Sequence, residues 1–420
     1  MWNTAIPQQA RNSELKIPFC RRPYRGPERL ATMTDENTNQ LIVKALTNGL
    51  GNDQFEVVNI KCLDAHLLGH AFKYHERTRN IAGVYPYRID YLAKDGSRQS
   101  IDVMVKAKPD QASIIAVYQS LLDQCGIKLK SSLSDNLANS DYTTPNLKEA
   151  VLFRDFEGRL QPYVPASLGV YIDRASSYTL RLEQKLPAGS LILDPDDDTT
   201  QRWSPSFSEL TLRGIADIHA RFCNNYQSLL DTGYFFVCDL KAMMQARELW
   251  QAFHDFLRVA YGNVMSPALA RRHQTILDSM TDWYALVDKQ PKTLLYGDVN
   301  PQNLAFAKTE GGFELSVFDW ERAVISLPQR DLAEHLIYTL PEDFGKQAAL
   351  ERIEIYRTAF AQKAAARIDK EAFFHGLVWM LYDLIINRLP LMMIVKQVAR
   401  KRRHSDTAYT KAHMLLSYLS

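Results

Sequence analysis

Two short segments in the second half of the chain carry closely spaced carboxylate and amide side chains. They run from Tyr296 to Asn303 and from Phe318 to Glu321, and each continues a short apolar run typical of a buried strand. One carboxylate can accept the proton of an attacking hydroxyl, while an amide and a second carboxylate can hold Mg²⁺ against phosphate oxygens. The pattern predicts phosphoryl transfer from ATP, with Asp298 as the base and Asn303 and Asp319 as the metal ligands.

The first segment resembles the catalytic loop of the aminoglycoside phosphotransferase and choline-kinase-like superfamily, whose members are small-molecule kinases with a protein-kinase-like fold. The family usually writes this loop H-G-D-x-H-x-x-N. Gly297, Asp298 and Asn303 match the motif, whereas Tyr296 and Asn300 stand where the family has its two histidines. A histidine at position 300 could carry a positive charge near the phosphates, but an amide stays neutral at every working pH.

The second segment resembles the family's I-D-W-E motif through Asp319, Trp320 and Glu321. Further along, residues 328–333 resemble its G-x-x-x-D-L-A stretch, in which the aspartate, here Asp331, is mainly a structural anchor. Because the two loops follow each other at the family's spacing, the resemblance implies an ATP- and Mg²⁺-dependent enzyme.

The resemblance also implies a nucleotide-binding site in the first half of the chain. Lys106 ends a strand as the family's ATP-phosphate lysine does, and Glu149 heads a helix as that lysine's ion-pair partner does. Lys108 lies on the same strand face by period-2 alternation and remains the alternative.

Two other parts of the nucleotide-binding site match the family's motifs less closely. Residues 178–186, which include Glu183, resemble the inter-lobe hinge that presents backbone groups to adenine. The phosphate loop is expected at residues 77–86, where Gly83 occurs but no G-x-G-x-x-G motif does.

The surrounding patterns predict an α+β chain with a β-rich lobe and a helical lobe, and the resemblance implies that the two lobes form a protein-kinase-like fold. Alternating β-rich runs between residues 55 and 108, with a hairpin at Asp95-Gly96, precede mostly helical sequence that begins at the Ser204-Pro205 helix start. We expect an irregular extension over 1–35, a β-rich, nucleotide-binding N-lobe over 36–186, and a larger helical C-lobe over 187–420 that carries the catalytic loop and the acceptor site.

Composition narrows the class of protein. The net charge is only +2 in 420 residues, which argues against a nucleic-acid binder, and 46% hydrophobic residues argue against disorder. Scattered cysteines and a polar N-terminus favour a cytoplasmic protein. The most apolar stretch, residues 373–398, is interrupted by polar residues, so we expect a buried helix pair bent at Pro390 and no membrane partner.

Several other residues have structural explanations. We expect His219 to be packed and hydrogen-bonded, the basic run 396–403 to be a solvated helix, and the aromatic residues over 250–261 to be mostly core, with some available to an acceptor pocket.

The prediction is therefore a small-molecule kinase whose partners are ATP and a hydroxyl-bearing acceptor. The acceptor's identity and the oligomeric state stay open. The alternative is a catalytically inactive nucleotide-binding or interaction module, because both loop histidines and the glycine-rich loop are lacking. A protein-substrate kinase is disfavoured, since ten residues from Glu321 to Asp331 are too few for an activation loop.

Overall fold

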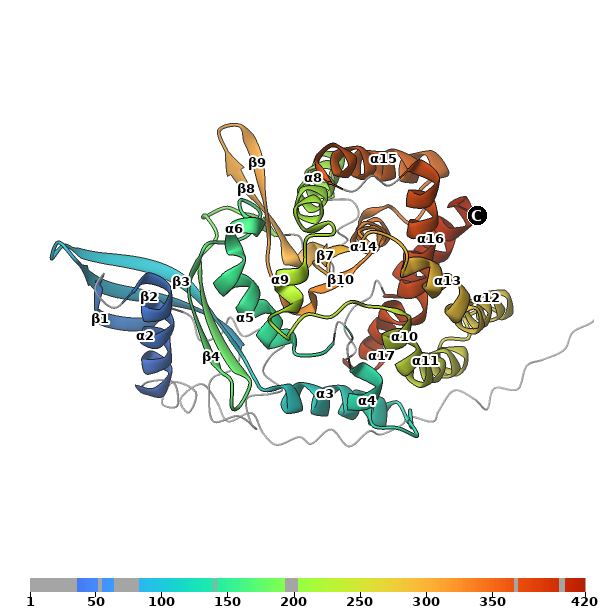
Figure 1. Cartoon of the computed structure of the whole chain (residues 1–420), viewed down its shortest axis with the longest axis horizontal. Helices are drawn as coiled ribbons and strands as arrows, with labels where there is room; N and C mark the ends of the chain where they lie inside the picture. The colour runs from blue at the N-terminus through green and yellow to red at the C-terminus, as the bar shows by residue number, and fades with distance from the viewer. Residues whose placement is uncertain are drawn as a thin grey trace, which may run out of the picture.

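The computed structural model describes residues 36–51, 55–63, 83–138, 140, 142–192, 203–365, 369–399 and 405–419. The expected N-terminal extension and residues 77–82 of the expected phosphate loop lie outside the described residues. The predicted fold class is confirmed: a small lobe built on an antiparallel sheet lies beside a larger helical lobe (Figure 1).

The N-terminal half contains most of the strands. Its elements are α2 (Glu36–Leu50), β1 (Phe55–Cys62), β2 (Gly83–Ala93), β3 (Arg98–Lys108), α3 (Gln111–Gln124), α4 (Leu133–Leu137), α5 (Pro145–Asp155), α6 (Glu157–Leu160), β4 (Ser167–Asp173), β5 (Tyr178–Gln184) and β6 (Leu191–Ile192).

Helices dominate the C-terminal half. Its elements are α8 (Pro205–Phe222), α9 (Gln227–Leu230), α10 (Leu240–Gln245), α11 (Arg247–Ala260), α12 (Pro267–Asp278), α13 (Met280–Val287), β7 (Thr293–Leu295), η3 (Pro301–Asn303), β8 (Leu304–Thr309), β9 (Gly312–Val317), η4 (Trp320–Arg322), β10 (Val324–Ser326), α14 (Gln329–Thr339), α15 (Lys346–Lys363), α16 (Lys370–Ile386), α17 (Arg388–Ala399) and α18 (Ser405–Leu419).

The sheet of the small lobe has five antiparallel strands in the order β1-β2-β3-β5-β4. The predicted hairpin between β2 and β3 is confirmed, because Ala93 and Ser97 bond across a turn in which Gly96 has a φ of 77°. Since side chains alternate along a strand, β3 turns Val105 and Ala107 to one face and its two lysines to the other. The register places Lys106 opposite Arg181 of β5.

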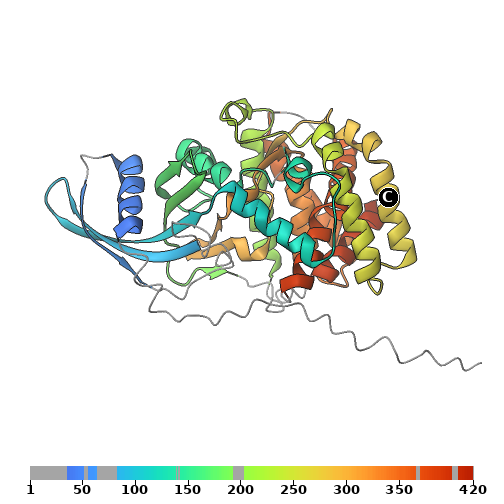
Figure 2. The same cartoon turned by 90° about the horizontal axis from the view of Figure 1, so that it is seen from below.

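Helix α2 covers the apolar face of this sheet (Figures 1 and 2). Its buried side chains pack with apolar residues of β2, β3 and β5 in a core separate from that of the large lobe. The helix can approach β4 closely because Gly169 has no side chain, since a Cβ there would overlap the carbonyl oxygen of Ala45. The opposite face of the sheet, with the lysines, is therefore left to the site between the lobes.

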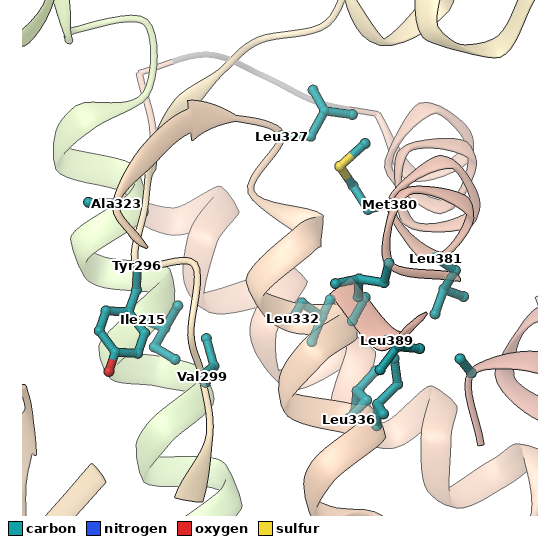
Figure 3. Packing of buried hydrophobic residues seen from close by; sticks show 14 of the residues in the cluster. Ile215, Tyr296, Val299, Ala323, Leu327, Leu332, Leu336, Met380, Leu381 and Leu389 are labelled. Carbon is teal, nitrogen blue, oxygen red and sulfur yellow. The ribbon is translucent and has the colours of Figure 1, made fainter. Parts of the chain in front are cut away.

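The core of the large lobe supports the first predicted loop from behind. Figure 3 shows Tyr296 and Val299 of that loop beside Ile215 of α8, with Leu332 of α14 and Leu389 of α17 further along the same apolar cluster. The predicted start of α8 is confirmed, because the hydroxyl of Ser204 accepts the N–H of Phe207.

Helices α3 and α4 form an insertion between β3 and α5 that reaches the large lobe. Helix α3 contacts α17, and α4 contacts α10 and α11 (Figure 2). The carboxylate of Glu248 accepts the hydroxyl of Ser131 at 2.5 Å, and Gln245 donates to the carbonyl oxygen of Asp135 at 2.6 Å. The sequence of this segment does not predict α4, because five residues are too few to show a helical period.

The apolar C-terminal stretch is a buried helix pair, but its bend is not at Pro390. Helix α16 ends before Asn387, and Pro390 lies in the first turn of α17, where a missing N–H costs no hydrogen bond. Residues 370–398 are long and apolar enough to cross a membrane by length and composition alone, yet 78% of the most apolar window is buried within the protein.

Candidate active site

The first predicted loop begins where β7 ends, and a buried carboxylate holds it there. Asp331 of α14 accepts the backbone N–H groups of Tyr296 at 2.7 Å and Gly297 at 3.0 Å. Its Oδ2 also lies 3.1 Å from Nε2 of His219, whose other ring nitrogen bonds the hydroxyl of Tyr356. Asp331 is therefore the structural anchor that the sequence predicted, and His219 is the packed residue expected there.

Gly297 gives this loop its sharp turn. Its φ is 79°, and a Cβ at this position would lie 2.5 Å from the carbonyl oxygen of Arg322. Any other residue here would have to adopt an unfavourable left-handed backbone conformation, and its Cβ would clash with the carbonyl oxygen of Arg322. The turn leads directly into Asp298, the next residue.

Asp298 is largely buried, and its carboxylate forms an ion pair with Arg388 of α17. Arg388 also places its Nε 3.3 Å from Oε1 of Glu334, while Oε2 of Glu334 accepts the N–H of Val299 at 3.2 Å. Burial raises the pKa of Glu334 to about 7, and the nearby charge of Asp298 adds to this. The proposed base thus sits in a buried cluster of two acids and one arginine.

Backbone and side-chain bonds tie the second loop to the first. The amide of Asn303 donates to the carbonyl oxygen of Asp298 at 3.3 Å, and the N–H of Phe318 donates to the carbonyl oxygen of Asn303 at 3.1 Å. The hydroxyl of Tyr296, in place of the family's first histidine, donates to the carbonyl oxygen of Phe318. Burial raises the pKa of Tyr296 well above its ordinary value, so the phenol stays a donor. Asp319 follows directly, with the left-handed φ of 73°.

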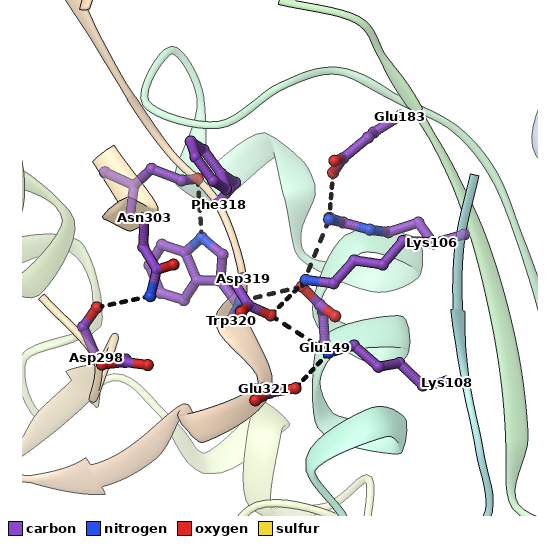
Figure 4. Close-up of polar contacts among 12 residues, drawn as sticks. Lys106, Lys108, Glu149, Glu183, Asp298, Asn303, Phe318, Asp319, Trp320 and Glu321 are labelled. Carbon is purple, nitrogen blue, oxygen red and sulfur yellow. Dashed lines mark hydrogen bonds and ion pairs between the residues drawn. The ribbon is translucent and has the colours of Figure 1, made fainter. Parts of the chain in front are cut away.

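Lys106 joins this pair of loops to the small lobe (Figure 4). Its Nζ lies 2.6 Å from Oε1 of Glu149 on α5 and 2.5 Å from Oδ1 of Asp319. Glu149 also accepts the N–H of Trp320 at 3.0 Å and lies 3.4 Å from Nη2 of Arg181. Burial alone would raise the pKa of Glu149, but Lys106 and Arg181 hold it below its ordinary value.

Lys108 belongs to the same site rather than replacing Lys106. It pairs with Glu321 and lies 3.5 Å from Oδ1 of Asp319, with 18% of its side chain exposed against 6% for Lys106. Burial would raise the pKa of Asp319, but both lysines hold it below the ordinary range. Lys106 alone bridges Asp319 and Glu149 among the described residues, as expected of the phosphate lysine.

The expected hinge has to be moved. Residues 178–184 form β5, whose backbone pairs with β3 on one side and β4 on the other, so it is not available to adenine. Glu183 turns its carboxylate to Arg181. Only Lys185 and Leu186 of the expected hinge lie beyond the strand.

Asn300, in place of the family's second histidine, has a local structural contact. Its side-chain oxygen accepts the N–H of Gln302 at 3.3 Å and caps η3. It is buried and neutral, and it contributes no charge to the site.

The remaining predicted residues suit Mg²⁺ by their chemistry. Asn303 and Asp319 offer amide and carboxylate oxygens, which this hard cation prefers. The hydrogen bond between Phe318 and Asn303 keeps the two loops together, and 29% of the Asp319 side chain is exposed. The described residues thus fit the metal that the sequence implied.

Arg388 and Arg181 were not among the predicted site residues. Arg181 could have been predicted from the sequence, because a charged residue that alternates with apolar neighbours in a buried strand needs a partner. It faces the same side of the sheet as Lys106. Arg388 carried none, because it lies ninety residues from its partner Asp298.

The two loops lie within a segment that matches a known protein family. Residues 217–367 match the model of the phosphotransferase enzyme family, APH, which confirms the resemblance over the segment that contains Asp298, Asn303 and Asp319. Lys106 and Arg388 lie outside the matched segment.

Several solved structures match this chain at low sequence identity. Aminoglycoside 2'-phosphotransferase-IIIa in complex with GDP is 10% identical, with 91% of this chain and 98% of that chain covered and a TM-score of 0.43. Choline kinase LicA from Streptococcus pneumoniae is 12% identical, with 91% and 99% covered and a TM-score of 0.38. A microcompartment-associated aminopropanol kinase is 12% identical, with 91% and 95% covered and a TM-score of 0.42. A search of curated proteins found no match.

Proposed function

We propose that this protein is an ATP- and Mg²⁺-dependent phosphotransferase that moves the γ-phosphoryl group onto a hydroxyl of a small molecule. One observation carries the proposal: Lys106 Nζ lies 2.6 Å from Glu149 and 2.5 Å from Asp319. A buried lysine held by a glutamate, and aimed at the carboxylate of a metal-binding loop, is the arrangement that phosphoryl transfer from ATP requires. The family-model match over residues 217–367 supports the same reaction.

Each group has a distinct task in this reaction. Lys106, oriented by Glu149, donates hydrogen bonds to the α- and β-phosphate oxygens. Asn303 and Asp319 would hold Mg²⁺, whose charge neutralises the phosphate oxygens. Asp298 orients the acceptor hydroxyl and takes its proton as the new bond to the γ-phosphorus forms and the bond to the ADP oxygen breaks.

The lysine must exchange partners when nucleotide binds. Lys106 and Lys108 both lie against Asp319, so this carboxylate has two ammonium partners. Nucleotide phosphates offer these ammonium groups new acceptors, which leaves Asp319 available to the metal. Binding of ATP and of Mg²⁺ is therefore expected to be mutually dependent.

A panel assay tests the proposal. Purified protein with Mg-ATP is incubated with amino-alcohols, sugars, nucleosides and antibiotics, and ADP formation is measured. Asp298→Asn is expected to reduce turnover by about 10²-fold or more while the thermal shift produced by Mg-ATP stays close to that of the unmodified protein. A protein that neither binds Mg-ATP nor forms ADP with any acceptor would refute the proposal.

The alternative, an inactive nucleotide-binding module, has one observation in its favour: Asp298 is already paired with Arg388. Such a module would show a thermal shift with ATP and no ADP formation with any acceptor. The same panel therefore distinguishes the two functions.

A further inference from the structure

Arg388 reaches the proposed base from a distant part of the chain. It is the first residue of α17, and its side chain is 7% exposed. Its guanidinium pairs with Asp298 through Nη2 and with Glu334 through Nε. No other cationic side chain in the described part of the chain forms an ion pair with Asp298.

The position of Arg388 is fixed by the break between α16 and α17. Asn387, at the break, donates its amide to Oδ1 of Asp383 at 2.9 Å, and Arg330 donates to Oδ2 of the same carboxylate at 2.9 Å. The break is thus a hydrogen-bonded feature within the core. It starts a new helix at the point from which an arginine can reach Asp298.

Glu334 holds the arginine from its second side. One carboxylate oxygen accepts from Arg388, and the other accepts the backbone N–H of Val299 in the catalytic loop. The guanidinium and the loop therefore share one buried acid. A movement of α17 would be transmitted to Asp298 both directly and through Val299.

The loop itself provides no positive charge at this point. Position 300 is an asparagine whose side-chain oxygen is used to cap η3. Negative charge spreads over the oxygens of the transferred group in the transition state, and fixed cations near that group lower the barrier. Arg388 supplies a positive charge beside the residue that would hold the acceptor oxygen.

We propose that Arg388 is a positioning residue for phosphoryl transfer, which fixes Asp298 toward the acceptor oxygen and provides the cationic charge that the catalytic loop lacks. This rests on the proposed function. The acceptor loses its proton to Asp298 and gains the phosphoryl group, ADP leaves, and Arg388 keeps its charge throughout. The arginine thus acts on the reaction through Asp298 and through the field at the transfer point.

Hydrolysis of Mg-ATP, with water as the acceptor, provides an assay that needs no identified substrate. Arg388→Ala is expected to lower kcat by about 10²- to 10³-fold with little change in the KM for ATP. Added guanidinium ion at millimolar concentration is expected to restore part of that kcat. Arg388→Lys keeps the positive charge but loses the planar guanidinium group. Its kcat is expected to lie between those of the unmodified enzyme and Arg388→Ala.

Lys411→Ala is the matched control. Lys411 is a buried cation of the same helical core that donates to the carbonyl oxygen of Leu340 at 2.7 Å, and among the described residues it forms no ion pair with Asp298. This variant is expected to lower the melting temperature as Arg388→Ala does, while kcat for the folded protein stays near that of the unmodified enzyme and does not respond to guanidinium.

The outcomes separate the possibilities. An Arg388→Ala enzyme with unchanged kcat, or a loss equalled by Lys411→Ala and insensitive to guanidinium, would show that Arg388 only stabilises the fold and would overturn the inference. If Arg388→Ala does not fold, an Arg388→Lys enzyme with unchanged kcat and KM would overturn it equally. An unmodified protein that hydrolyses no ATP and phosphorylates no acceptor would instead refute the proposed function, and the inference with it.

Discussion

Replacing Lys106 with methionine tests the charge network that joins the two lobes. Methionine has a similar length and no charge, so the substitution removes the ammonium group and little packing. The side chain of Lys106 is 6% exposed and the Glu149 side chain 4% exposed, so both groups lie where water does not screen them. Leaving one member of a buried ion pair without its partner costs about 3–5 kcal/mol.

The remaining contacts place the expected cost near the lower end of that range. Glu149 keeps Arg181 at 3.4 Å and the N–H of Trp320, and Asp319 keeps Lys108 at 3.5 Å. We therefore expect Lys106→Met to lower the free energy of unfolding by about 3 kcal/mol, which is a large part of the 5–15 kcal/mol typical of a folded protein. The thermal shift with Mg-ATP should also be lost, because the phosphate donor is gone.

Equilibrium unfolding in urea measures this change, and a double variant isolates its cause. Lys106→Met combined with Glu149→Gln removes both charges, so it should cost less than the sum of the single variants, with a coupling of about 1–3 kcal/mol. Lys108→Met is the control: its lysine is more exposed and its partner Glu321 is 31% exposed, so about 1 kcal/mol or less is expected. If Lys106→Met costs no more than Lys108→Met, the assignment of Lys106 as the centre of the buried network is wrong.

Two further predictions concern the loop and the helical core. Gly297→Ala should destabilise the protein by about 2 kcal/mol or more and abolish turnover, because a Cβ would lie 2.5 Å from the Arg322 carbonyl oxygen. Gly311→Ala is the control: a Cβ at that position would have no neighbouring atom within 4 Å, so neither the melting temperature nor kcat should change. Burial lowers the pKa of His413 from 6.5 to about 4, so the unfolded chain binds its proton first and stability should fall by up to about 3 kcal/mol as the pH drops from 6.5 to 4. His413→Gln should flatten this part of the melting-temperature profile; an unchanged slope would assign the acid sensitivity to other groups.

The sequence predicted the parts of the site that lie on local patterns. Asp298 and Asp319 each come shortly after a short apolar strand, and Asn303 lies five residues after Asp298. The end of such a strand can be recognised in the sequence, so these residues could be placed at strand ends. Lys106 could be placed on the correct face of its strand for the same reason, although period-2 alternation could not separate it from Lys108. Only the helix bearing Glu149, which is distant in sequence, distinguishes the two lysines in the structure.

The features that were missed depend on contacts between distant segments. Arg388 meets Asp298 because α16 ends at Asn387, and that break depends on a carboxylate shared with Arg330 on another helix. Residues 178–184 were predicted as part of the hinge because they resemble the family's hinge. The same residues also have the alternating pattern of a strand. Pairing with β3 and β4 decides between them, and that pairing is a property of the whole sheet.

For a rotation of the small lobe relative to the large lobe, we take the connection from β3 to α3 as the pivot. The strand that bears the lysines leaves the sheet at Lys108 and enters α3 after Pro109 and Asp110, and α3 is packed on α17, the helix of Arg388. A strand advances about 3.3 Å per residue, so Lys106 lies about 10 Å from this pivot and the Asp95-Gly96 turn about 40 Å. A 10° rotation, on the order of a modest domain movement, would shift Lys106 by about 2 Å and the turn by about 7 Å at these lever arms. Such a rotation would move the far hairpin several times more than the lysines, which would stay close to Asp319.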